Sequence, residues 1–227
     1  FEGALAWIEA ATDPELGRIG YDHFVALKRT IDTTDVNKGA LTAAMDAAHK
    51  QAVASFRRAA DLDPDRSFAR VMLGQIAALV RDVPSALQEW GEALAVDPTA
   101  RVDHGWISSK TEPPAAHEFY RLARERYLAR EHHDRSRAAT LTFYMGLARY
   151  GQADWQAARA LFAEAHAQIE HVVERLLQDA GVRRLLQYPN HTYFNDRLVL
   201  PLKMEYRGRL PGIIHRASDS GATLYVE

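Results

Sequence analysis

The chain has 227 residues, of which 47% are hydrophobic and 26% are charged, which is the composition of a folded globular protein rather than of a disordered or fibrous one. Its formal net charge of -2 argues against a dedicated nucleic-acid binder, because such a protein needs a concentrated basic surface. Cysteine is absent, which excludes disulfides, thiolate zinc sites and a cysteine nucleophile.

No run of residues approaches the roughly 20 apolar positions that a membrane-spanning helix requires, so we expect no membrane span. The sequence begins at Phe1 rather than at Met, and we expect that further residues precede it. The absence of cysteine and of an initiator Met slightly favours a protein exported to the bacterial periplasm or envelope, although a cytoplasmic protein fits nearly as well.

Residues 1–32 contain two apolar stretches, GALAWIEAA and YDHFVALKRTI. Each stretch is typical of a helix, and together they predict one or two helices that cap the N-terminal end of the segment that follows. The pattern changes at residue 33, where a longer periodicity begins.

Two stretches with the same ending, RRAADLDPDR and GEALAVDPTA, place Asp-Pro pairs 34 residues apart, at Pro64 and Pro98. Proline cannot continue a helix, so each pair predicts a helix end. Aligning the two endings brings small and aromatic residues into one register. These residues are Gly39-Ala40, Ala52, Phe56 and Ala59 before the first ending, and Leu73-Gly74, Ala86, Trp90 and Ala93 before the second.

Residues 139–172 contain a third copy of the pattern, without the closing proline. The residues that keep the spacing are Gly146, Ala158, Phe162 and Ala165. An apolar period near 3.6 continues from there to Leu176, which predicts an extended last helix. Residues 101–138 hold a degenerate copy, whose first helix, around RVDHGWISSK, is expected to be short.

This pattern resembles the tetratricopeptide repeat family, in which small residues let two antiparallel helices approach closely and an aromatic side chain fills the gap to the next repeat. The repeats would be 33–66, 67–100, the degenerate 101–138, and 139–172. The resemblance implies an all-α fold, a right-handed α-solenoid of helical hairpins that extends to residue 187. Other solenoids built from helical hairpins are the main alternative.

Residues 188–227 are expected to form a small β-rich extension. The stretch RLVLPLKMEY alternates with a period of two, which predicts a strand with Leu198, Leu200 and Leu202 on one side, followed by Met204 and Tyr206. Its proline makes it an edge strand or interrupts it. The stretch GIIHRASDSGATLYVE predicts a hairpin with its turn at 218–221. The extension caps the last helices, pairs with another chain by strand addition, or continues beyond this sequence.

Two stretches contain incomplete metal-binding patterns. His132, His133 and Asp134 form a His-x-Asp pair that would need a third ligand, and a polar helix end explains the stretch better. His166 and Glu170 share one helix face, but no second helix carries a matching pair. We therefore expect no metal and no cofactor.

Motifs that would indicate catalysis are missing from the sequence. It has no Gly-x-Ser-x-Gly elbow, no phosphate-binding loop and no dinucleotide fingerprint. The stretch DLDPD lacks the spaced oxygen ligands and the glycine of a calcium loop. No segment brings together a nucleophile, a base and an orienting group, so we expect no enzymatic activity within these residues.

In tetratricopeptide arrays the first helices of successive repeats line a groove that receives a peptide or a helix of a partner. The resemblance therefore implies a protein or peptide partner, and the predicted strand adds further contact positions. The candidate partner-binding residues are Asn37, Leu41, Phe68, Val71, Gln75, Phe143, Leu147, Tyr150, Leu198, Leu200 and Leu202. A branch of the family clamps a partner's terminal carboxylate with Lys and Asn side chains, which this sequence mostly lacks. Burial between helices is the alternative role for several of these residues.

These patterns favour a non-enzymatic protein-interaction scaffold or assembly subunit that binds a partner through the groove and the C-terminal extension. A second hypothesis is a regulatory or substrate-presenting module of a larger enzyme or enzyme complex. A third is self-association, in which the C-terminal strand of one copy pairs with a neighbour.

Overall fold

The computed structural model describes residues 2–33, 38–134, 136–194 and 197–227. The described residues are mostly helical, and a small antiparallel sheet lies near the C-terminal end. They form two compact units, unit 1 (Phe1–Ala165) and unit 2 (His166–Glu227). The prediction of a mainly helical chain with a small β-rich C-terminal part is therefore confirmed. None of the described helices is long and apolar enough to cross a membrane.

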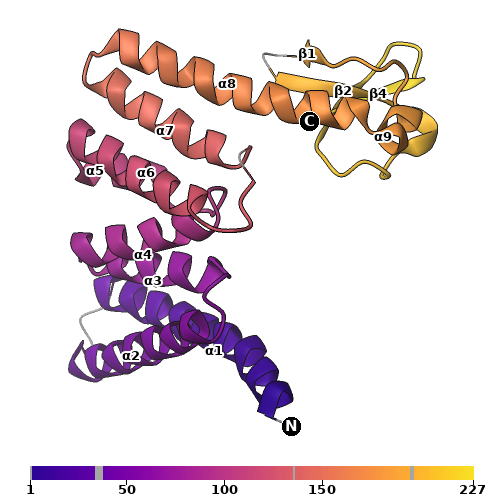
Figure 1. The fold of residues 1–227 in the computed structure, drawn as a ribbon. Coiled ribbons are helices and arrows are strands. Elements are labelled where there is room, and N and C mark those ends of the chain that lie inside the picture. Colours follow the sequence, from indigo (N-terminus) through magenta and orange to yellow (C-terminus); the bar gives the residue numbers. More distant parts are fainter. Residues whose placement is uncertain (1, 34–37, 135, 195–196) are drawn as a thin grey trace. The chain divides into compact units, whose positions relative to one another are not determined.

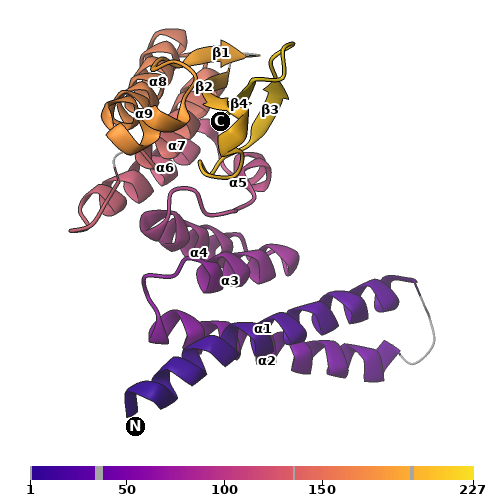
Figure 2. The same cartoon turned by 90° about the vertical axis from the view of Figure 1, so that its right-hand side faces the viewer.

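Most helices of unit 1 pack against the next helix along the chain, and α4 packs against α6. They are α1 (Glu2–Thr33), α2 (Lys38–Leu62), α3 (Phe68–Leu79), α4 (Val83–Val96), α5 (His104–Lys110), α6 (Pro113–Leu128), α7 (Ala138–Gly151) and the first part of α8 (Trp155–Gln178). Helix α1 contacts α2, α2 contacts α3, α3 contacts α4, α4 contacts α6, and α6 contacts α7. Figures 1 and 2 show α1 and α2, and then α3 and α4, as adjacent antiparallel pairs.

Local sequence signals set the ends of these helices. The Asp82 carboxylate accepts a hydrogen bond from the Ser85 backbone N–H at 3.2 Å, and so caps the start of α4. Asp103 caps α5 in the same way, through the Trp106 N–H at 2.8 Å. Helices α2 and α4 end one residue before the Asp-Pro pairs that contain Pro64 and Pro98. Each pair therefore ends a helix, as predicted.

Glycine residues allow the paired helices to approach closely. A Cβ atom on Gly74 of α3 would lie 2.5 Å from Nε1 of Trp90 in α4, and one on Gly146 of α7 would lie 2.6 Å from Cε1 of Phe162 in α8. Each aromatic ring thus occupies the space that a larger residue would need.

The first helical pair differs from the predicted repeat 33–66. Residues 38–62 form the single helix α2, because no glycine or proline interrupts the sequence after Gly39. The ring of Phe56 packs instead on Gly17 of α1, where a Cβ atom would lie 2.8 Å from the ring. Residues predicted to cap the array therefore supply the first helix of this pair. Gly39, assigned to the close helix contact, has no atom within 4 Å of its Cβ position.

The degenerate copy keeps the pairing with different residues. Helix α5 has 7 residues, whereas α3 has 12 and α7 has 14. His104 takes the position that Gly74 has in α3, and its Nδ1 lies 3.0 Å from the hydroxyl of Tyr120 in α6. The side chains of Trp90, Ile107 and Tyr120 are buried in one core with residues of α3, α4 and α7.

Unit 2 combines the last part of α8 with a short helix and a four-stranded sheet. Its elements after α8 are α9 (Ala180–Leu185), β1 (Thr192–Phe194), β2 (Arg197–Lys203), the 3-10 turn η1 (Met204–Tyr206), β3 (Ile214–Ala217) and β4 (Thr223–Val226). The strand order is β1-β2-β4-β3, and all neighbours are antiparallel. The predicted hairpin is β3–β4, and Gly221 in its turn has a φ of 71°, which favours glycine.

Strand β2 lies between β1 and β4 in the strand order, but Pro201 itself pairs with a strand on one side only, the side of β4. The carbonyl of Pro201 accepts a hydrogen bond from the Gln187 N–H at 2.8 Å, so the proline nitrogen points to the same side, away from β4. The missing N–H therefore costs no hydrogen bond between β2 and β4. Val199 and Leu202, on opposite faces of the strand, are both 0% exposed. The strand ends at Lys203, so the predicted alternation through Tyr206 is too long.

Candidate functional site

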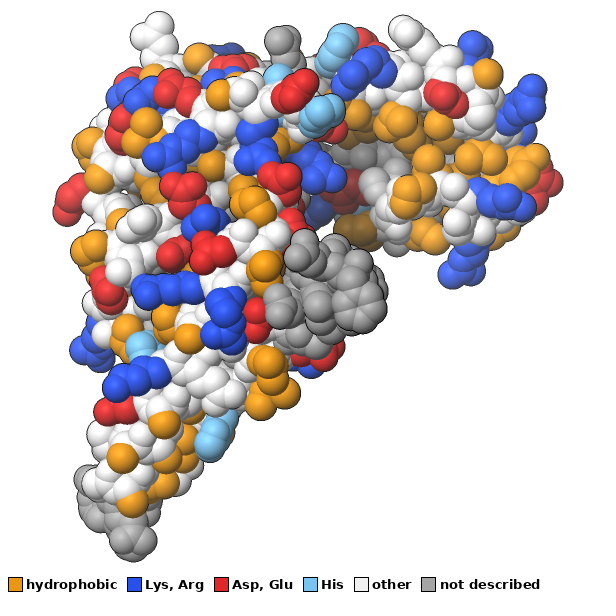
Figure 3. Space-filling view, turned by 60° about the horizontal axis from the view of Figure 1, so that its bottom comes forward, with side chains coloured by type: hydrophobic (Ala, Val, Ile, Leu, Met, Phe, Trp, Pro, Cys, Tyr) orange, Lys and Arg blue, Asp and Glu red, His pale blue; other side chains and the backbone are white. Residues whose placement is uncertain are grey.

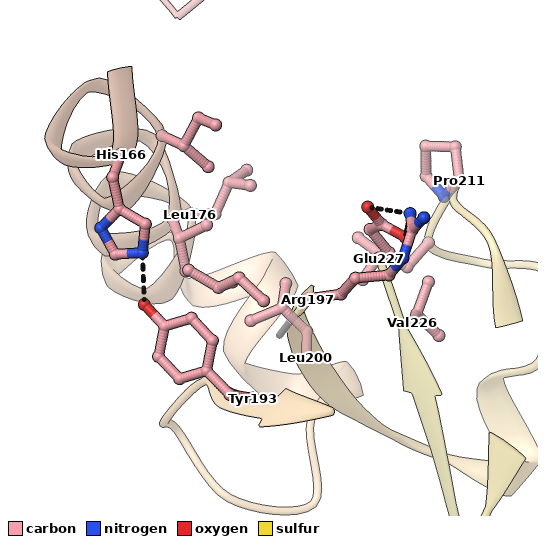
Figure 4. Close-up of a pocket in the computed structure, with 12 residues that line it drawn as sticks. His166, Leu176, Tyr193, Arg197, Leu200, Pro211, Val226 and Glu227 are labelled. Carbon is pink, nitrogen blue, oxygen red and sulfur yellow. Dashed lines mark hydrogen bonds and ion pairs between the residues drawn. The ribbon is translucent and has the colours of Figure 1, made fainter. Parts of the chain in front are cut away.

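An apolar cavity of about 350 Å³ lies within unit 2. Its size falls in the lower part of the range typical of small-molecule sites, about 300–1,000 Å³. Its walls come from α8, β1, β2, the segment before β3, and the end of β4 (Figure 4). The lining residues are His166, Ile169, Val173, Leu176, Tyr193, Arg197, Leu198, Leu200, Leu210, Pro211, Val226 and Glu227.

The apolar wall follows from the periodicities of the two elements that face the cavity. In α8, Ile169, Val173 and Leu176 recur every three or four residues and so lie on one helix face. In β2, Leu198 and Leu200 are two residues apart and point to the same side of the sheet. Contacts with these side chains favour the apolar part of a ligand.

One end of the cavity carries a hydrogen-bonded group of three polar side chains. The hydroxyl of Tyr193 lies 3.2 Å from Nε2 of His166 (Figure 4). It also donates a hydrogen bond to Oε1 of Glu170 at 2.9 Å. Nδ1 of His166 is 3.5 Å from Oε2 of Glu170. Partial desolvation and the bond to Glu170 raise the pKa of the Tyr193 hydroxyl, so it remains a donor at neutral pH.

The other end carries an ion pair. Nη1 of Arg197 lies 3.0 Å from Oε2 of Glu227, and Nε2 of His215 lies 2.6 Å from the same oxygen. Desolvation alone would raise the pKa of Glu227, but the hydrogen bonds from His215 and Arg197 outweigh it and hold the pKa below its ordinary value. The ionised carboxylate neutralises Arg197. The cavity therefore suits an uncharged, mainly apolar group.

The described residues contain no group of three or more His, Asp or Glu side chains placed to hold a metal ion. His166 and Glu170 do share a face of α8, and the third group beside them is the Tyr193 hydroxyl. In the His132 stretch, Nδ1 of His133 lies 2.8 Å from the Arg130 carbonyl.

The predicted groove residues of unit 1 divide into exposed and partly buried positions. Phe68, Phe143, Leu147 and Tyr150 are 38%, 45%, 42% and 56% exposed, and Gln75 is also exposed. Leu41 and Val71 are half-buried, and Val71 packs against the core. Leu41 lies on α2, which is the second helix of its pair. Asn37 lies outside the described residues.

The strand residues proposed as partner contacts lie inside unit 2. Leu200 is packed with Val173 and Leu186, and Leu202 with Leu224 and Val226. Leu202 is 0% exposed, so it is a core residue and not a contact surface. Leu198 is half-buried and, with Leu200, lines the cavity. Residues 197–199 of β2 pair with β1, and residues 200–203 pair with β4.

Sequence reasoning singled out His166 and Glu170 only as an incomplete metal-binding pair, and it missed the other polar residues at the two ends of the cavity. Tyr193 comes from the three-residue strand β1, which is too short to show a period. Arg197, His215 and Glu227 lie far apart in the sequence and meet only through the pairing of β2, β4 and β3.

No family model matches the chain. Parts of it are similar to curated proteins named Endonuclease MutS2. The identity is 39% over 69 residues with the protein from Pelotomaculum thermopropionicum, covering 30% of this chain and 9% of that protein. The identity is 42% over 59 residues with the protein from Alkaliphilus oremlandii, covering 26% of this chain and 8% of that protein. It is 45% over 62 residues with the protein from an Anaeromyxobacter strain, covering 27% of this chain and 8% of that protein. The similar segments thus span less than a tenth of these relatives.

Proposed function

We propose that this protein is a non-enzymatic interaction scaffold, in which unit 1 is a right-handed α-solenoid of tetratricopeptide-like hairpins that binds a partner protein. Three helix pairs support the repeat, since Gly17 meets Phe56, Gly74 meets Trp90, and Gly146 meets Phe162. The 34-residue spacing of the Asp-Pro endings supports it independently.

The observation that carries this proposal is an exposed apolar stripe on α7, formed by Phe143, Leu147 and Tyr150. These side chains are spaced four and three residues apart, so they lie on one face of the helix. The ring of Trp155, which is 58% exposed, packs edge-on against Tyr150 at 4.7 Å between centroids. Clustered exposed apolar and aromatic side chains are typical of protein-binding surfaces.

A matched pair of substitutions tests the scaffold proposal. Leu147 on α7 and Leu122 on α6 are both 42% exposed, so Leu147→Glu and Leu122→Glu make the same chemical change on different faces. Affinity purification of the full chain, followed by mass spectrometry, should recover a partner with the wild type and with Leu122→Glu but not with Leu147→Glu. Equal recovery with both variants would remove α7 as the contact surface.

A second candidate function is that of a module within a larger enzyme that acts on DNA. It is favoured by the similarity to proteins named endonucleases. The matching segments are 59 and 69 residues long in two of these relatives, so the shared part would be a short segment of this chain.

The charges of unit 1 favour the first candidate over direct DNA binding by that unit. Figure 3 shows basic and acidic side chains interspersed on the displayed face. Arg124 pairs with Glu164 at 2.6 Å, and Arg126 pairs with Glu92 at 2.5 Å, so these cations are already neutralised.

Fluorescence anisotropy with a labelled DNA duplex, at two salt concentrations, separates the two candidates. The scaffold proposal predicts no saturable binding at 150 mM salt. Salt-dependent saturable binding, together with nicking of a supercoiled plasmid in the presence of Mg²⁺, would favour the enzyme module instead.

A further inference from the structure

A second cavity, of about 220 Å³, lies within unit 1, and we name it the α5–α7 pocket. Its walls are formed by the end of α5, the connection to α6, the first half of α6 and the second half of α7. Leu147 belongs both to its lining and to the exposed stripe on α7, so the pocket opens beside that stripe.

The pocket lies where α5 ends and α6 begins. Helix α5 ends at Lys110, and Pro113 starts α6 shortly afterwards. Ser108 and Thr111 beside this turn, Pro113 at the start of α6 and Gly151 at the end of α7 line the pocket.

The aromatic wall of the pocket is held rigidly. The rings of Tyr120 and Tyr144 are stacked at 5.2 Å with an interplanar angle of 21°. The ring of His104 stacks on Tyr144 at 3.6 Å, and its Nδ1 bonds to the Tyr120 hydroxyl. Because three rings support one another, the wall is preorganised for a flat apolar group.

The volume and the rim select the kind of occupant. At about 220 Å³ the pocket is smaller than the roughly 300–1,000 Å³ of small-molecule sites, so a single side chain is the better match. Lys110 and Glu112 flank the lining residue Thr111 and are both exposed, so the rim carries both signs of charge. A charged side chain therefore gains no net attraction, and the aromatic wall favours an uncharged ring.

We infer that the α5–α7 pocket receives one uncharged aromatic side chain of a partner peptide that lies along the stripe on α7. This inference rests on the proposed scaffold function and specifies what the partner must present. A buried aromatic anchor surrounded by a weaker apolar contact is the usual arrangement of a binding hot spot.

The direct test uses p-cresol, the side-chain analogue of tyrosine, with the full chain. Titration followed by ¹H–¹⁵N NMR should give saturable shifts at the amides of Ala116, Ala148 and Gly151. Ala148→Leu extends a side chain into the pocket and should weaken p-cresol binding at least tenfold. Ala160→Leu makes the same change at an exposed position of α8 and should leave binding unchanged. No shifts at these amides, or unchanged binding by Ala148→Leu, would overturn the inference.

A gentler variant guards against misfolding of Ala148→Leu. A Cβ atom on Gly151 would lie 3.5 Å from Cγ of Pro113, an ordinary contact distance, so Gly151→Ala narrows the pocket without a clash. This variant should fold normally and bind p-cresol several-fold more weakly. Wild-type affinity in a folded Gly151→Ala protein would count against the pocket.

Peptide selection distinguishes failure of this inference from failure of the scaffold proposal. A random peptide library displayed on phage is selected on the full chain and then tested on the variants. Peptides that share an aromatic residue, and lose binding to both Leu147→Glu and Ala148→Leu, support the pocket and the scaffold. Loss of binding to Leu147→Glu alone would overturn the pocket and leave the scaffold standing. No selected peptide, together with no p-cresol shift, would overturn both.

Discussion

Replacing Gly74 by alanine should destabilise the contact between α3 and α4, although alanine is the better helix former. The new methyl group would lie 2.5 Å from Nε1 and 2.8 Å from Cγ of Trp90. The Trp90 side chain is 2% exposed, and its Nε1–H donates to the Val71 carbonyl at 3.1 Å. The ring therefore cannot move away without losing packing or this hydrogen bond.

The expected magnitude follows from three opposing terms. Overpacking a close-packed site costs about 1–3 kcal/mol, and loss of the Trp90 hydrogen bond costs about 1 kcal/mol. The higher helix propensity of alanine returns about 1 kcal/mol. The free energy of unfolding of Gly74→Ala should thus fall by about 2 kcal/mol.

Urea denaturation followed by circular dichroism at 222 nm measures this change. Gly39→Ala is the matched control, because a Cβ atom at that helical position meets nothing within 4 Å. The control should be unchanged or stabilised by up to about 1 kcal/mol. A Gly74→Ala protein at least as stable as the wild type would refute the close-contact account of the repeat.

Three further predictions concern individual side chains. Burial lowers the pKa of His104 from an ordinary 6.5 to about 4. Between pH 6.5 and pH 4 the unfolded chain therefore binds more protons than the folded chain, so the free energy of unfolding should fall as the pH drops through this range. The free energy of unfolding should fall by about 2 kcal/mol over this range, after allowance for the partial exposure of His104. Urea midpoints at pH 7 and pH 4.5 measure this loss. The loss should vanish in His104→Gln, and a variant that keeps the wild-type pH dependence would contradict the prediction. Leu202→Ala removes a fully buried side chain and should lower the free energy of unfolding by about 2–5 kcal/mol. Because β2 pairs with β4, the β4 amides should then exchange hydrogen faster. Unaltered exchange would show that Leu202 is not a core residue. Arg197→Gln removes a charge that lowers the pKa of Glu227, so NMR titration should give a higher pKa for that carboxyl than in the wild type, and an equal value would contradict the ion pair.

Most of the secondary structure that could be predicted follows from the periodicity of the sequence. The Asp-Pro endings place the ends of α2 and α4, where the proline does not continue the preceding helix. Proline alone does not decide this, because Pro14 lies inside α1. The long apolar period after Trp155 predicts α8, and the alternation around Leu200 predicts β2. These signals depend only on neighbouring residues, so they are legible in one sequence.

The pairing of elements was less predictable than the elements themselves. The 34-residue register assigns Gly39 to the close contact of the first repeat, but the structure places Gly17 there, because an uninterrupted α2 needs a partner helix outside it. Pro201 was expected to make β2 an edge strand or to interrupt it. Only the structure shows that Pro201 pairs with β4 on one side and accepts the Gln187 N–H through its carbonyl on the other.

In the candidate sites too, positions within one helix were predictable, whereas sites formed by several elements were not. Phe143, Leu147 and Tyr150 were predicted from the repeat register and are exposed on α7. The α5–α7 pocket was not predicted, because its lining comes from α5, α6 and α7 together and no sequence motif marks it. The cavity of unit 2 likewise depends on strand pairing that brings Arg197 to Glu227.

Site-specific photo-crosslinking in cells tests the central claim, that the exposed stripe of α7 holds a partner protein. A benzophenone amino acid is placed at Tyr150, which is 56% exposed, or at Leu122 on α6, which is 42% exposed. The scaffold account predicts one discrete adduct from position 150 and none from position 122. Adducts of equal yield from both positions, or none from position 150, would contradict it.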